Sequence, residues 1–242
     1  MIAVPHSIAI FKERRPKLTP GRGEVMPGSD VYNIVVVGAM NPRIHHPSWY
    51  ELVGILTPEQ AKEALASSAT FGLPGIVQLS APSLGLTINC TERQWTVKTE
   101  NKGNIGLLQS ITFRVFDELL KYTPVSAYGF NVLYQRETRC PHVGKFLAGL
   151  ITGSRLGLPA DEADVTLRRS LGDHKGQVII QKSPHGKGSV SLSFNHEYST
   201  NDSLNQFFIM RERVPAQFGA ALTDADEQTA RILGEINTTA GA

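Results

Sequence analysis

The sequence lacks the features that quickly assign a chain to a class. It has two cysteines in 242 residues, so at most one disulfide can form. It has neither an apolar run of about 18 residues nor a signal-peptide pattern, which predicts a cytoplasmic protein without a spanning helix. Its formal net charge of +2 is too small to predict a nucleic-acid partner by itself.

The composition that is present is that of an ordinary folded protein. Apolar residues make up 41% of the chain and charged residues 19%, which is typical of globular domains. The sequence contains no spacing typical of zinc ligands or of a phosphate-binding loop, and no cluster with enough oxygen ligands for a hard cation. We therefore expect no metal and no cofactor.

The stretch from 103 to 138 organises the fold prediction. Apolar residues recur at helical spacing over 104–121, and Thr123-Pro124 ends that helix. The following strand alternates between a small-residue face and an aromatic face. The aromatic residues are Tyr128, Phe130 and Tyr134. We expect the helix to pack on the small-residue face and leave the aromatic face for a neighbour.

The rest of the chain repeats an order of strands followed by a helix. Strand patterns occupy 31–37, 76–80, 84–90 and 94–99, and again 165–171, 177–182 and 189–198. Thr57 and Gln60 predict a capped helix start, and two helices are expected after Asp202, with Pro215 bending the first and Thr223 capping the second. These patterns predict an α+β fold in which long helices back one or two antiparallel sheets, with two strand-strand-strand-helix halves as a possible arrangement.

Composition divides the chain into four segments. Residues 1–30 form a basic arm rich in proline and glycine, and 31–138 form the first α+β half. A short helix and linker occupy 139–163, and the second half occupies 164–242. The order of antiparallel strands and a long helix is similar to the layout of SecB-type export chaperone subunits. That likeness is one of layout over about half of the chain; it implies apolar grooves for partner binding and assigns no residue a role.

The densest cluster of chemically capable side chains follows the first strand. His45 and His46 stand beside Trp49 and Tyr50, and histidine can act as an acid, a base or a metal ligand. Adjacent histidines on an extended chain point in opposite directions, so only one could serve a given site. Packing of the loop around Trp49 is the more ordinary explanation.

Two further groups have candidate chemistry. Cys140 and His142 place a thiol near an imidazole, as in a cysteine-based enzyme, but one pair of residues is weak evidence. Basic residues in the arm and in the second half could contact nucleic acid, with Trp95 or Tyr128 as stacking surfaces. These basic residues are Lys12, Arg14, Arg15, Arg168, Arg169 and Lys187.

Three functions follow from these observations. The first is a non-enzymatic interaction or assembly protein, such as an adaptor or chaperone, that is oligomeric and binds a protein partner or itself. Its contact residues would be Trp49, Tyr50, Tyr128, Phe130 and Tyr134. The alternatives are a nucleic-acid-binding module that uses the basic arm and hairpins, and an enzyme built on the histidines or Cys140.

Overall fold

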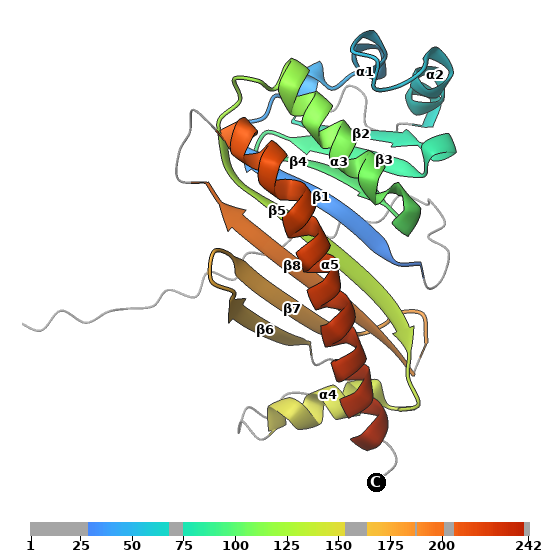
Figure 1. Ribbon diagram of the computed structural model, residues 1–242. Coiled ribbons are helices and arrows are strands. Elements are labelled where there is room, and N and C mark those ends of the chain that lie inside the picture. The colour runs from blue at the N-terminus through green and yellow to red at the C-terminus, as the bar shows by residue number, and fades with distance from the viewer. Residues whose placement is uncertain (1–28, 68–74, 153–163, 187, 201–205, 240–242) are drawn as a thin grey trace, which may run out of the picture.

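A single sheet of eight strands forms the centre of the molecule, in the order β2-β3-β4-β1-β5-β8-β7-β6, and all neighbouring strands are antiparallel (Figure 1). The computed structural model describes residues 29–67, 75–152, 164–186, 188–200 and 206–239. The strands are β1 (Val31–Gly38), β2 (Ile76–Ala81), β3 (Leu86–Thr91), β4 (Gln94–Thr99), β5 (Val125–Glu137), β6 (Val165–Ser170), β7 (Lys175–Lys182) and β8 (Ser189–Ser199). The predicted α+β fold is confirmed, and in the described residues one sheet runs through both predicted halves.

Five helices accompany the sheet in the described residues. They are α1 (Pro47–Leu52), α2 (Pro58–Ser67), α3 (Ile105–Arg114), α4 (Val143–Thr152) and α5 (Gln206–Thr239), and a π-helical turn at Val115–Leu119 extends α3. The predicted start of α2 is confirmed. Thr57 N donates to Gln60 Oε1 over 2.9 Å, and Gln60 N donates to Thr57 Oγ1 over 3.3 Å. Each side chain thus satisfies a backbone N–H that the first helical turn leaves without a partner.

The two halves of the sheet repeat one arrangement of strands: β2-β3-β4-β1 from one edge and β6-β7-β8-β5 from the other. In the set β1–β4, the first and fourth strands are neighbours and the second strand forms the sheet edge. The set β5–β8 repeats this arrangement, and each set is followed by a helix, α3 or α5. The two sets meet where β1 pairs with β5.

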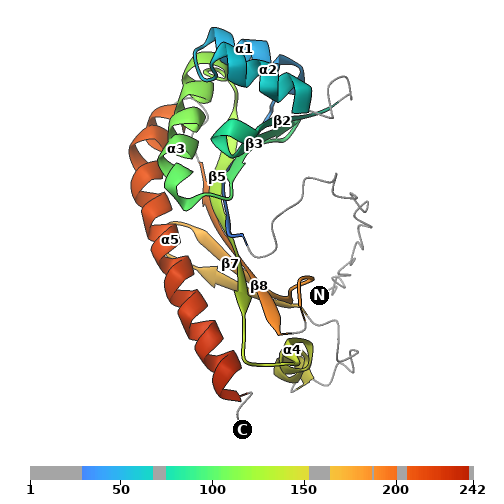
Figure 2. The ribbon, with the colours of Figure 1, turned by 90° about the vertical axis from the view of Figure 1, so that its right-hand side faces the viewer.

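Helices α3 and α5 lie on the same face of the sheet (Figure 2). The π-helical turn of α3 places Phe116 against Trp95 of β4, with ring centroids 5.6 Å apart. Helix α5 stacks Phe218 on Phe130 of β5, with centroids 4.7 Å apart. These four rings are almost completely buried, so this helix-covered face contains the main hydrophobic core.

The predicted packing of the helix at 104–121 is wrong. Helix α3 packs on β1 and β4, whereas α5 covers β5 and β8. Tyr128, Phe130 and Tyr134 therefore lie under α5, at 3%, 0% and 1% exposure, and are not free for a neighbour. Strand alternation identifies two faces but does not say which one a helix will cover, and here the large rings supply the apolar area that α5 buries.

The C-terminal region forms one helix, not the two that were predicted. Thr223 does not cap a new helix, because its Oγ1 donates to Gly219 O over 3.1 Å within the continuous helix. Pro215 lies inside the helix, where it removes one backbone hydrogen bond. Val214, Phe218 and Ala221 are buried on either side of it, and this packing holds the two parts in one helix.

Candidate functional site

The face of the sheet opposite α3 and α5, which we call the open face, is mostly polar, and Val35 of β1, Leu133 of β5 and Ile179 of β7 are among its apolar side chains. Its residues alternate with the buried residues of the helix-covered face, and most are half-buried or exposed. Seven aromatic side chains stand in the described strands, and all of them belong to the helix-covered face. The open face therefore differs from the apolar groove implied by the chaperone-like layout, because it offers hydrogen-bonding groups.

One register row of the open face consists entirely of polar side chains. Its members lie directly opposite one another on consecutive strands across the whole sheet. From β2 to β6 they are Ser80, Thr87, Lys98, Asn33, Asn131, Asn195, Gln177 and Arg168, and we call them the polar row. At about 4.8 Å between strands, the row extends over roughly 34 Å, the length of about ten residues of extended chain.

The centre of the polar row contains unsatisfied hydrogen-bonding groups. Asn33 lies opposite Asn131, which lies opposite Asn195. The Oδ1 atoms of Asn33 and Asn131 are buried and have no hydrogen-bond partner within the described residues. A buried acceptor without a donor costs about 1–3 kcal/mol. Both residues are half-buried, so a ligand whose N–H groups meet these oxygens as the side chains turn toward the surface would recover that free energy.

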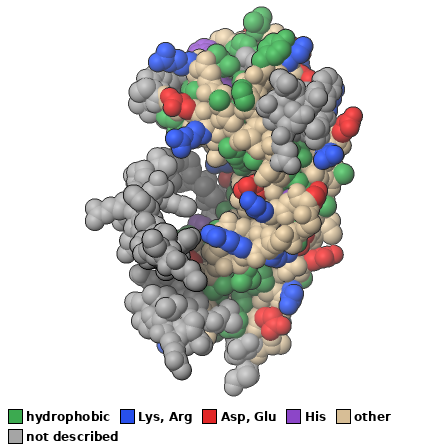
Figure 3. Space-filling model, turned by 90° about the vertical axis from the view of Figure 1, so that its left-hand side faces the viewer, with side chains coloured by type: hydrophobic (Ala, Val, Ile, Leu, Met, Phe, Trp, Pro, Cys, Tyr) green, Lys and Arg blue, Asp and Glu red, His purple; other side chains and the backbone are tan. Residues whose placement is uncertain are grey.

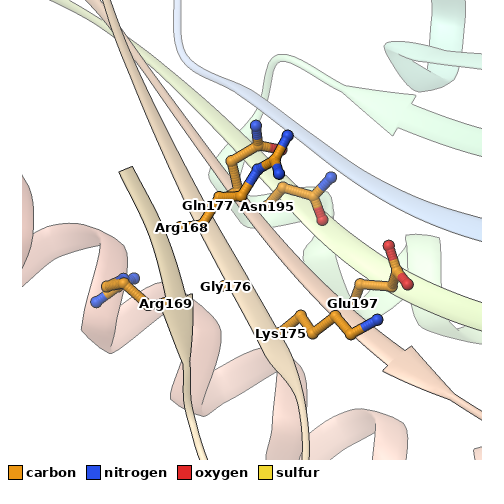
Figure 4. A pocket seen from close by; sticks show the side chains of 7 residues that line it. All are labelled: Arg168, Arg169, Lys175, Gly176, Gln177, Asn195 and Glu197. Carbon is orange, nitrogen blue, oxygen red and sulfur yellow. The ribbon is translucent and has the colours of Figure 1, made fainter. Parts of the chain in front are cut away.

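A cavity of about 260 Å³ lies at the β6 end of the polar row. Its lining residues are Arg168, Arg169, Lys175, Gly176, Gln177, Asn195 and Glu197 (Figure 4). Figure 4 shows the side chains of Arg168, Gln177 and Asn195 projecting together, with Lys175 beside Glu197. Lys175 and Glu197 are direct cross-strand neighbours, so their charges offset each other. Of the two arginines, Arg169 is paired with Asp224, so Arg168 provides the net positive charge.

The two adjacent arginines of β6 do not form a common basic face. Arg169 points toward α5, where its guanidinium donates to both carboxylate oxygens of Asp224, over 2.9 and 2.5 Å. The Arg169 hydrogen bonds lower the pKa of Asp224 below its usual value. Arg168 projects from the opposite face and is exposed. The other predicted nucleic-acid contacts, Lys12, Arg14, Arg15 and Lys187, lie outside the described residues, and the proposed stacking rings of Trp95 and Tyr128 are buried.

The cluster around His45 serves to attach a loop to the sheet. His45 Nδ1 lies 2.6 Å from Tyr50 Oη, and Trp95 Nε1 donates to the same oxygen over 3.4 Å. Burial lowers the pKa of His45 to about 4, so its imidazole is neutral at physiological pH. Tyr50 is fully buried, and Trp49 is half-buried with its ring edge-on to Tyr50.

The remaining candidates for catalysis are dispersed. His46 Nδ1 accepts from Ser48 N over 3.3 Å and so caps α1. Cys140 is buried just before α4, whereas His142 is exposed. Helices α1 and α4 lie at opposite ends of the molecule (Figure 1), so these histidines do not share a cleft. In the described parts of the chain, no group of three or more His, Cys, Asp or Glu side chains could hold a metal ion.

Sequence reasoning did not select the asparagines and glutamine of the polar row. Each strand shows the alternation that places them on one face, but their alignment depends on the strand order. Asn33 and Asn131 are 98 positions apart in the sequence, and nothing in either strand identifies the other as its partner.

No family model matches this sequence, and no curated protein matches it significantly. Among the described residues, no helix combines the length and apolar character needed to cross a membrane.

Proposed function

We propose that this protein binds an extended polypeptide along the polar row of the open face. The observation that supports this most directly is the pair of buried Oδ1 atoms, of Asn33 and Asn131, that have no hydrogen-bond partner among the described residues. They lie at the centre of a row that is polar on all eight strands of the sheet. This proposal is a specific form of the protein-binding function predicted from the sequence.

The chemistry of the row favours a polypeptide as ligand. A carboxamide side chain contains the same donor and acceptor groups as a peptide bond, so it can pair with both the N–H and the C=O of a bound chain. Four adjacent members of the row, from β1, β5, β8 and β7, are carboxamides. An extended chain also has free backbone groups along its whole length, which a folded partner lacks.

Nucleic acid is less well supported as the ligand. Sequence-tolerant binding of single strands uses aromatic side chains for base stacking, and the described strands place none on the open face. On the side of the molecule drawn in Figure 3, which views the sheet edge-on, Lys and Arg side chains are interspersed with Asp and Glu, without an extended area of one sign. The polar row itself contains two cationic residues, Lys98 and Arg168.

Selection from a random library of twelve-residue peptides tests the proposal. The full chain is immobilised, and the affinity of an enriched fluorescein-labelled peptide is measured by anisotropy. We expect the double variant Asn33→Ala/Asn131→Ala to bind the peptide at least tenfold more weakly. Asn89→Ala removes the same chemical group from the same face outside the row and should change the affinity less than twofold.

Two results would contradict the proposal. One is a selection that enriches no peptide, or only peptides that bind the double variant as tightly as the natural sequence. The other is tighter binding of a labelled twenty-nucleotide oligothymidine than of any selected peptide at physiological salt, which would favour the nucleic-acid function.

A further inference from the structure

The cavity at the β6 end of the polar row holds charged groups without ion-pair partners. Arg168, Lys175 and Glu197 are all exposed, and none of their side chains forms an ion pair or hydrogen bond with another described residue. The situation of Arg169 is different, because Asp224 neutralises it on the other face of the same strand. Of the two adjacent arginines, only Arg168 therefore offers its guanidinium to a ligand.

The groups around Arg168 complete a site for a carboxylate. A guanidinium can donate two parallel hydrogen bonds to the two oxygens of a carboxylate. Gln177 lies directly opposite Arg168, and Asn195 lies opposite Gln177. Their amide N–H groups project beside Arg168 into the same space (Figure 4). A carboxylate there would have both charge compensation and further donors for its remaining lone pairs.

The neighbouring register row limits how much negative charge the cavity accepts. Lys175 and Glu197 are cross-strand partners in the next row of the open face. Because Asp224 neutralises Arg169, the remaining lining charges are two cations and one anion, a net charge of +1. This balance suits one carboxylate and is too small for a phosphate-rich ligand. The volume of about 260 Å³ also suits a single side chain or chain terminus.

Building on the proposed function, we infer that the bound polypeptide places a carboxylate group against Arg168, Gln177 and Asn195. The carboxylate is that of an aspartate or glutamate side chain or of the peptide C-terminus. It fixes one end of the ligand at β6 and so determines the direction in which the chain runs along the polar row.

Peptide variants separate these two sources of the carboxylate. A selected peptide is compared with a form amidated at its C-terminus and with a form in which Asp and Glu are replaced by Asn and Gln. We expect one of the two replacements to weaken binding about tenfold. Arg168→Gln should weaken binding of the original peptide to the same degree and should not affect the neutralised peptide.

Two matched variants control for general electrostatics. Arg93→Gln removes an exposed positive charge at the β3–β4 turn, near the far edge of the sheet, and should change the affinity less than twofold. Glu197→Gln removes the anion of the cavity and should strengthen binding severalfold.

Failure of this inference is distinguishable from failure of the proposed function. Peptides that bind with unchanged affinity after both neutralisations, or equally well to Arg168→Gln, would overturn the carboxylate site and leave the polar row as a binding surface. A selection without any enriched peptide would overturn both.

Discussion

Asn33 of β1 and Asn131 of β5 lie directly opposite each other where the two sets of four strands meet. Both side chains bury a carboxamide oxygen without a hydrogen-bond donor in the described structure. Such an arrangement lowers the stability of the free protein, and a bound chain that donates N–H groups to these oxygens would restore the lost free energy.

Replacing both asparagines by valine should therefore stabilise the protein and abolish binding. The double variant Asn33→Val/Asn131→Val removes two unsatisfied polar atoms, and valine favours strands, so we expect the free energy of unfolding to rise by about 1–2 kcal/mol. Urea denaturation measures this change. The comparison variant Asn89→Val, on the same face outside the row, should lie within about 0.5 kcal/mol of the natural protein. A less stable double variant would show that the two amides have a structural role.

Truncation of Phe218 tests the packing of α5 on β5. Phe218 is fully buried and stacks on Phe130, so Phe218→Ala should lower the free energy of unfolding by about 3–5 kcal/mol. Glu227→Ala changes an exposed residue of the same helix and should shift stability by less than about 0.5 kcal/mol. Equal midpoints of thermal unfolding for the two variants would contradict the described core.

Stability should fall at acidic pH because of the buried histidine His196. His174 Nε2 lies 3.1 Å from His196 Nδ1, and His196 Nε2 lies 3.3 Å from Asp224 Oδ2. Burial is the main cause that lowers the pKa of His196 to about 4; His174 and Arg169 lower it further, and Asp224 opposes them.

The direction of the pH effect follows from proton linkage. The unfolded chain protonates His196 near pH 6.5, whereas the folded chain does so near pH 4, so stability is lost as the pH falls through this interval. Between pH 7 and pH 5 this residue should account for a loss of about 2 kcal/mol. Denaturation curves of His196→Gln at the two pH values should show a correspondingly smaller difference. The exposed variant His142→Gln should retain the full difference; a full difference in His196→Gln would contradict the assignment.

Local patterns in the sequence predicted most strands and the start of α2, because they depend on neighbours in the chain, although Pro215 and Thr223 wrongly divided α5 into two helices. The alternation in β8 and the paired side chains of Thr57 and Gln60 are examples. Contacts between distant segments could not be predicted in the same way. That α5 would cover Tyr128 and Phe130 depends on how β5 pairs with β8, which no local pattern encodes. The polar row was missed for the same reason, since it exists only once all eight strands are in register.

The most direct test of peptide binding along the polar row is a titration of labelled protein with a selected peptide, followed through the side-chain amide signals in a ¹⁵N NMR spectrum. We expect the signals of Asn33, Asn131, Asn195 and Gln177 to shift together on saturation, because these amides form new hydrogen bonds. The amide of Gln217, which is bonded to Tyr128 under α5, should not move. Shifts confined to Gln217 and other groups of the helix-covered face, with the four row amides unchanged, would contradict binding along the row.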